Sequence, residues 1–166
     1  MILLASTSDL LAVITSAAVA THVHASWADL NGSTVTPGRT NTSISTAATT
    51  TVVASPAAST YRTVKTLSIR NTHATTAQDV TVRHTDGTNA MELVKVTLSA
   101  GDALQYDEHN GFTVRDSLGR IKSRSDGLVS AAVNSLNTVV LASDVTNNNA
   151  VANTIADVTA LSFAVT

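Results

Sequence analysis

The sequence predicts an all-β protein, an antiparallel β-sandwich or jelly-roll-like domain with a short C-terminal β segment. Three observations favour this fold class. Apolar and polar residues alternate along much of the chain, which is the period of a half-buried strand. Turn residues recur at intervals of roughly eight to twelve residues. Hydrophobic residues make up 43% of the chain but aromatic residues only 3%, so small aliphatic side chains must fill the core.

The stretch LLAVITSAAVATHVHASWADL is predicted to form two strands, about Leu10–Thr15 and Ala20–Ala28. Its apolar start has the length of the core of a secretory signal. However, no Lys or Arg precedes Arg39, and Asp9 comes directly before the apolar run. The run is also shorter than the roughly 20 apolar residues that a membrane span needs. We therefore expect strands here, with no export signal and no membrane segment.

The next stretches predict further short strands. Pro37-Gly38 in TVTPGRTNTSIST indicates a turn. TTTVVASPA indicates a short strand that Pro56 ends. In RTVKTLSIRN the later apolar residues alternate, whereas Val64 is out of phase with them. This change of phase predicts a β-bulge.

Two hairpins are predicted further along the chain. DVTVRHT and LVKVTLSAG flank TDGTN (Thr85–Asn89), and Asp-Gly between alternating runs is a strong hairpin signal. ALQYD and GFTVRD flank EHNG, where Asn110-Gly111 is expected to take the left-handed conformation. Val80 and Val82 are expected to share one face of their strand.

We expect these strands to form one attachment domain at residues 1–122. Residues 123–137 are rich in Ser, Asn and Gly, which predicts a linker. Residues 138–166 contain two strand-like pieces, Val139–Ala142 and Val158–Val165. About 29 residues cannot bury a core alone. This segment is therefore expected to pack on the first domain, to pair with another subunit, or to begin a further module.

The charge content argues against a nucleic-acid partner. Charged residues make up 13% of the chain, and the formal net charge is −2. So low a charge favours a protein that packs against neighbours in an assembly. The chain has no cysteine, which excludes disulfides and thiolate chemistry. The one basic cluster is predicted to be a solvated linker because aspartates interleave with it: Arg115, Asp116, Arg120, Lys122, Arg124 and Asp126.

His22 and His24 are weak candidates for metal ligands. On a strand, positions i and i+2 place both imidazoles on one face, roughly 7 Å apart, and one ion can bridge such a pair. The opposite face, from Thr21 to Trp27, is expected to be the core side. A third ligand is needed, but no spacing selects one among His73, His84, Glu92, Asp107 and His109. We expect no metal and expect the pair to face solvent or a neighbouring subunit.

No motif predicts an enzyme or a cofactor. Asp107 and Glu108 are adjacent in a turn and cannot face each other across a cleft, as acid–base pairs must. His84 is expected near the rim of the core, as a hydrogen-bonded residue. The chain lacks both the Gly-x-Ser-x-Gly elbow and a glycine-rich phosphate loop. We expect a non-enzymatic protein.

Three long phrases resemble the N-terminal β-sandwich of tailed-bacteriophage virion proteins, of the fibre and decoration type. They are HASWADLNGSTVTPGRTNTSIST, TTTVVASPAASTYRTVKTLSIRNTH and DVTVRHTDGTNAMELVKVTLSAGDALQYDEHNGFTVRDSLGRIK. VVLASDVTNNNAVANTIADVTALSFAVT is similar to the opening of a jelly-roll module that often follows in such proteins. The resemblance covers most of the chain and implies that the jelly roll continues past Thr166.

The resemblance implies a structural protein of the virion, a tail or neck fibre or tail-associated component anchored by its N-terminal sandwich. Its partners would be other virion proteins of the head, neck or tail. Such proteins are usually homo-oligomers, often trimers. Two alternatives stay open: a capsid decoration or head-fibre protein, and a carbohydrate-binding β-sandwich module. The second needs exposed aromatic side chains, but the aromatic residues are scattered: Trp27, Tyr61, Tyr106, Phe112 and Phe163.

Overall fold

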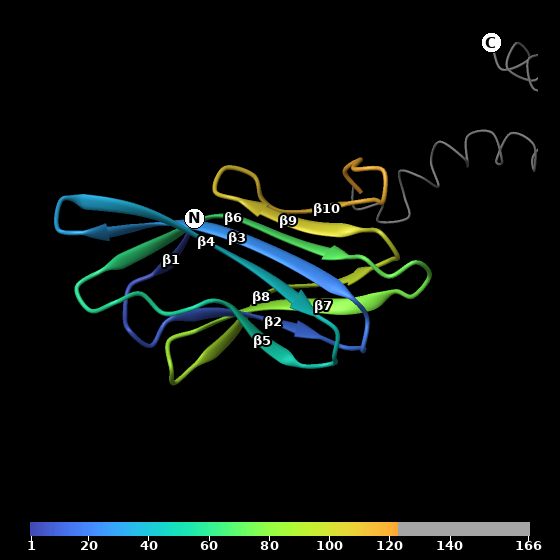
Figure 1. Ribbon diagram of the computed structural model, residues 1–166, viewed down its shortest axis with the longest axis horizontal. Helices are drawn as coiled ribbons and strands as arrows, with labels where there is room; N and C mark the ends of the chain where they lie inside the picture. The colour runs from blue at the N-terminus through green and yellow to red at the C-terminus, as the bar shows by residue number, and fades with distance from the viewer. Residues whose placement is uncertain (123–166) are drawn as a thin grey trace, which may run out of the picture. The chain divides into compact units, whose positions relative to one another are not determined.

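The computed structural model describes residues 1–122. They form ten strands in two antiparallel sheets that pack against each other, so the predicted all-β sandwich is confirmed (Figure 1). Within these residues, no helix has the length and apolar character to cross a membrane. The linker predicted at 123–137 and the segment predicted at 138–166 lie outside the described residues.

The ten strands are β1 (Ile2–Leu4), β2 (Leu10–Thr15), β3 (Thr21–Asn31), β4 (Thr34–Ile44), β5 (Thr49–Val53), β6 (Tyr61–Asn71), β7 (Gln78–Thr85), β8 (Ala90–Leu98), β9 (Ala103–Asp107) and β10 (Gly111–Arg115). The larger sheet, sheet A, has the strand order β10-β9-β6-β3-β4, and β1 pairs with the first part of β6. Sheet B has the order β5-β2-β7-β8. Three hairpins join neighbours within a sheet, β3–β4, β7–β8 and β9–β10, while the other connections cross between the sheets.

The core lies between the two sheets and is mainly aliphatic. Val80 and Val82 of β7, two residues apart on one face of the strand, are fully buried in it. The one aromatic pair of the described core joins Tyr106 to Phe112, with ring centroids 5.0 Å apart. The other large buried side chains are Leu4, Leu11, Val13, Val52, Val53, Val64, Leu67, Ile69, Leu98 and Leu104.

The predicted bulge in β6 is confirmed. Ser26 of β3 pairs with Thr66, whereas the next residue, Trp27, pairs with Val64. Lys65 is therefore the extra residue of the bulged strand. The bulge explains the phase change, because it lets Val64 face the core together with Leu67, although the two are three residues apart.

The turn predicted at Pro37-Gly38 is wrong. β4 runs through both residues, and the β3–β4 turn lies earlier, where Gly32 has a φ of +57°. Pro37 fits because β4 is the edge strand of sheet A, where a missing N–H breaks no interior ladder. Gly38 fits because it faces Trp27, whose indole occupies the space where a side chain would lie.

The two predicted hairpins are confirmed as β7–β8 and β9–β10. Gly87 and Gly111 take positive φ angles of +93° and +71° at their turns. The expectation was wrong for Asn110, because Ser59 is the one non-glycine residue with positive φ in residues 1–122. β1 was not predicted. It has only three residues and is held by non-local pairing with β6.

Candidate functional site

The two candidate histidines project from the outer face of sheet A, the face turned away from sheet B. Both are exposed, whereas Thr21, Val23 and Ala25 on the same strand are buried. The predicted division of β3 into a core face and an exposed face is therefore confirmed. The pair lies near the start of β3, between β6 and the edge strand β4.

Strand register surrounds His22 with polar side chains. His22 lies directly opposite Ser43 of β4 on one side and Arg70 of β6 on the other. Side chains of directly opposed residues share one face of a sheet and lie about 5 Å apart at Cβ. Arg70 is exposed. The guanidinium and the imidazole therefore stand side by side on the outer face.

A second row follows at His24. This residue lies opposite Asn41 of β4 and Ser68 of β6. Nδ1 of His24 and Oδ1 of Asn41 are 2.7 Å apart, which matches a hydrogen bond donated by the ring. We name the side chains of these two rows the polar grid: His22, His24, Asn41, Ser43, Ser68 and Arg70.

The polar grid lines an open depression of about 510 Å³ on the sheet, completed by Val23 and Thr42. The face is hollowed here because short serine side chains at 43 and 68 stand beside long histidine and arginine side chains. The volume lies within the range of small-molecule sites, about 300–1,000 Å³. Its lining offers hydrogen-bond donors and acceptors but no exposed apolar side chain.

The outer face around the depression is cationic. Arg39 stands one row beyond His24, opposite Ser26, and is exposed. The ion pairs within residues 1–122 involve other cations, namely Arg62, Lys65, Arg120 and Lys122. Neither Arg39 nor Arg70 therefore has a carboxylate partner in the described part of the chain.

The third ligand that a metal at His22 and His24 would need is not brought to them. In residues 1–122, no group of three or more His, Asp or Glu side chains is arranged to hold a metal ion. His73 lies in the β6–β7 connection, where its Nδ1 accepts the backbone N–H groups of Thr75 and Thr76. The other candidates are spread over separate elements: His84 on β7, Glu92 on β8, Asp107 on β9 and His109 in the β9–β10 turn.

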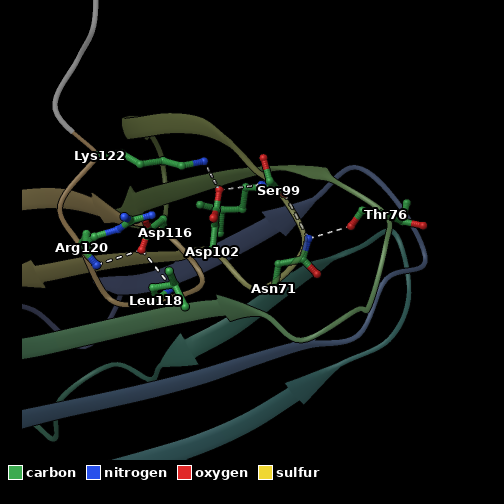
Figure 2. A network of polar contacts seen from close by, with 9 residues as sticks. Asn71, Thr76, Ser99, Asp102, Asp116, Leu118, Arg120 and Lys122 are labelled. Carbon is green, nitrogen blue, oxygen red and sulfur yellow. Dashed lines mark hydrogen bonds and ion pairs between the residues drawn. The ribbon is translucent and has the colours of Figure 1, made fainter. Parts of the chain in front are cut away.

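A buried polar network lies at the end of sheet A where β6 stops and β9 starts (Figure 2). The fully buried Asn71 donates from Nδ2 to the carbonyl oxygens of Thr76 and Leu98, at 2.8 and 3.1 Å. Its Oδ1 accepts the backbone N–H of His73. One amide side chain thus joins the end of β6 to the end of β8.

Asp102 is the second centre of this network. Its carboxylate is 3% exposed, accepts the backbone N–H of Ser99 and forms an ion pair with Lys122 (Figure 2). Its backbone carbonyl accepts the N–H of Asn71 at 2.9 Å. Sequence reasoning missed both centres. The signal was present at Asn71, which continues the apolar face of Leu67 and Ile69 and is a polar residue in a core register.

The basic cluster is not a solvated linker as far as Lys122. Arg115 forms a β-bridge with Ile121, so the chain folds back on β10. Asp116 accepts the N–H groups of Leu118 and Arg120 and pairs with the Arg120 side chain at 2.7 Å. Burial raises the pKa of Asp116, but these hydrogen bonds outweigh it and hold the pKa below its usual value. Arg124 and Asp126 lie outside the described residues.

The adjacent acids Asp107 and Glu108 serve the β9–β10 turn. Asp107 accepts the backbone N–H groups of His109 and Asn110, and the Asn110 side chain and these bonds lower its pKa. A hydrogen bond from Lys65 at 2.8 Å lowers the pKa of Glu108. Both carboxylates are therefore held in the charged form by exposed turn contacts.

His84 lies at the rim of the core, as expected, but it is not fully hydrogen-bonded. Its Nε2 is buried and has no partner among the described residues. It lines a small depression of about 200 Å³ with the apolar side chains of Met1, Ile2, Leu3 and Leu93. Apolar residues from the N-terminus lie beside His84 at the end of β7. Their side chains offer Nε2 no hydrogen-bond partner.

The aromatic side chains do not gather at the polar grid. Tyr106 and Phe112 pack in the core, and Trp27 packs under the guanidinium of Arg62, 4.5 Å from the ring centroid. Tyr61 is 55% exposed, at the far end of β6 from the grid. Phe163 lies outside the described residues. The described residues thus offer no cluster of stacking rings of the kind the carbohydrate-module alternative needs.

No protein-family model matches the chain, and neither a curated protein nor a solved structure matches it.

Proposed function

We propose that the protein is a non-enzymatic structural protein of a tailed-bacteriophage virion, a tail or neck fibre or tail-associated component anchored by its N-terminal sandwich. The sequence phrases quoted above suggest this class. One structural observation supports an assembly role most directly, an apolar row on the outer face of sheet A. It consists of Val35, Leu30 and Tyr61, which lie directly opposite one another on β4, β3 and β6.

The apolar row is unusual because its three members are neighbours. Val35 is 64% exposed and Leu30 is 42% exposed, beside the exposed Tyr61. Single exposed apolar residues are common on soluble proteins, whereas adjoining ones on a sheet face mark surfaces that other proteins cover. Pro37, in the neighbouring pair with Ala28, extends the row along the sheet.

Other virion proteins and further copies of this chain are the partners that fit this proposal. A low charge content leaves few groups that must stay hydrated, so much of the surface can be buried against neighbours at small cost. We expect a homo-oligomer, with a trimer as the form that the resemblance implies.

The location is tested with a gold-labelled antibody against residues 1–122, applied to purified particles of the source phage in electron microscopy. Label at the tail or neck is the expected result. Label over the head shell would replace this assignment with the capsid decoration or head-fibre alternative. Absence of the protein's peptides from purified particles, by mass spectrometry, would overturn the virion role altogether.

A pair of variants tests the apolar row itself. Tyr61→Ser combined with Val35→Thr is expected to leave a folded protein that no longer enters particles in a complementation assay. Met91→Thr is the matched control, because Met91 is equally exposed (62%) but lies on β8 of sheet B. Equal incorporation of both variants would show that the row is not the assembly surface.

A further inference from the structure

We propose that the polar grid, together with Arg39, is a binding site for an acidic saccharide whose carboxylate is held by the guanidinium of Arg70. This activity goes beyond the proposed structural role and does not depend on where the protein sits in a particle. It relies on charge and hydrogen bonds, and it differs in this from a carbohydrate-binding module that stacks sugars on aromatic rings. The argument rests on the charge of the depression, the chemistry of its lining and its size.

Charge selects an anion. Arg39 and Arg70 are exposed cations without an ion pair in the described residues. Asp107 lies opposite Thr66 on β9, four residues along β6 from Arg70, and already accepts two backbone N–H groups. A guanidinium presents a planar fork of donors that matches a carboxylate in a bidentate contact.

The lining selects a polyhydroxylated ligand. Ser43 and Ser68 supply hydroxyl groups, and Asn41 supplies an amide. Such groups both donate and accept hydrogen bonds, as sugar hydroxyls do. The depression exposes no apolar side chain. Arginine clusters also recognise acidic peptides, and an acidic peptide is therefore the ligand against which the saccharide is tested below.

The bond between His24 and Asn41 orients the site. With Nδ1 of His24 donating to Oδ1 of Asn41, Nε2 of the ring and Nδ2 of the amide make no further hydrogen bond within residues 1–122. Nε2 of the neutral ring is then an acceptor and Nδ2 of the amide is a donor, so the two atoms can meet hydroxyl groups of a sugar. A volume of about 510 Å³ accommodates one to two pyranose rings, within the range of small-molecule sites.

Titration with tri-galacturonate, followed by amide NMR shifts of the full chain, tests the proposal. The expected shifts centre on β3, β4 and β6 around the polar grid. Arg70→Gln should weaken binding about tenfold, because a charged hydrogen-bond pair is lost. His24→Gln should weaken it less. Lys95→Gln is the matched control, an exposed cation on β8 of sheet B, and should bind as the wild type does.

Two ligand controls make the test decisive. The fully methyl-esterified trimer keeps the sugar rings and loses the charge, and it should not bind. Tri-glutamate keeps the carboxylates and loses the rings, and it should bind much more weakly than tri-galacturonate. Equal binding of tri-glutamate would overturn the saccharide assignment. Absence of any shift at millimolar tri-galacturonate, or an equal loss in Lys95→Gln, would overturn the site.

Discussion

At the residue scale, the packing of Trp27 depends on the absence of a side chain at Gly38. The indole lies against Gly38 on β4, and the guanidinium of Arg62 covers its ring. Arg62 is held in place by Asp29, which it contacts through Nε and Nη2 at 2.7 Å each, and by the carbonyl oxygen of Ala54. Trp27, Arg62 and Asp29 therefore pack together beside Gly38.

We predict that Gly38→Ala lowers the free energy of unfolding by about 1–3 kcal/mol. A Cβ at position 38 would lie 2.4 Å from Nε1 of Trp27, so the indole must move. Urea unfolding followed by tryptophan fluorescence measures both effects, since the chain has a single Trp. Thr34→Ala, at an exposed position of the same strand, is the control. An unchanged unfolding midpoint in Gly38→Ala would contradict the packing described.

We predict that Asp9 makes the protein sensitive to acid. Burial raises the pKa of Asp9, but hydrogen bonds from the Ser6 hydroxyl and the N–H groups of Ala5 and Ser6 outweigh it, so the pKa lies below its ordinary 3.8. The carboxylate therefore stabilises the fold at neutral pH. This stabilisation is fully present above the unfolded-state value and is lost as the pH falls through the lowered one.

The measurement is thermal unfolding of wild type and Asp9→Asn at neutral pH and near pH 3. The variant should be less stable by about 1–3 kcal/mol at neutral pH, because buried donors lose their charged acceptor. Between neutral pH and pH 3, the free energy of unfolding should fall less in Asp9→Asn than in the wild type. Glu92→Gln, an exposed carboxylate on β8, is the control. An equal loss of stability in wild type and Asp9→Asn between neutral pH and pH 3 would refute the role of Asp9.

Residue patterns predicted the exposed face of β3 in the polar grid, but not the side chains that β4 and β6 contribute to it. The exposed face of His22 and His24 followed from the period of a strand, because both neighbours of each histidine belong to the opposite face. Arg70 and Asn41 could not be placed beside them. The position of Arg70 depends on the register of β6 against β3, and register between strands far apart in sequence is set by packing of the whole sandwich. Asn41 was missed because the turn between β3 and β4 was predicted at Pro37-Gly38 and lies at Gly32.

At the element scale, hairpins were predictable because their signal is local. The Asp-Gly and Asn-Gly pairs lie between the two strands that they join. The same reasoning failed at Pro37-Gly38, where an edge strand tolerates a proline and a neighbouring indole requires a glycine. Neither cause is visible locally. The identity of an edge strand and the position of Trp27 across from Gly38 are both consequences of the assembled sheet.

We predict that the network around Asp102 determines the stability of the last described elements. Asp102→Ala leaves the Ser99 N–H without its acceptor and should cost about 1–3 kcal/mol. Lys122→Met should also be destabilising, because it leaves the carboxylate of Asp102, whose side chain is 4% exposed, without its cation. Thermal unfolding measures both. Hydrogen exchange should also be faster at Lys122, whose N–H bonds to Val114, in Asp102→Ala. An unchanged unfolding temperature in both variants would contradict a stabilising role of this network.

At the scale of the whole molecule, residues 1–122 contain a complete two-sheet core. We therefore predict that a protein ending at Lys122 folds as a monomer, whereas the full chain forms an oligomer through residues 138–166. Multi-angle light scattering on both proteins measures the mass of each particle. The same number of copies per particle in both would refute a role of residues 138–166 in oligomerisation.

Pro37 has a consequence for how copies of this protein can associate. β4 is an eleven-residue edge, long enough to recruit a strand from another molecule. A proline in it offers no N–H and divides the edge into a short segment and Gly38–Ile44. A foreign strand crossing position 37 must leave one of its carbonyl groups unpaired. Crowded copies are thus discouraged from stacking edge to edge into fibrils, and are left to meet through the broad faces of their sheets.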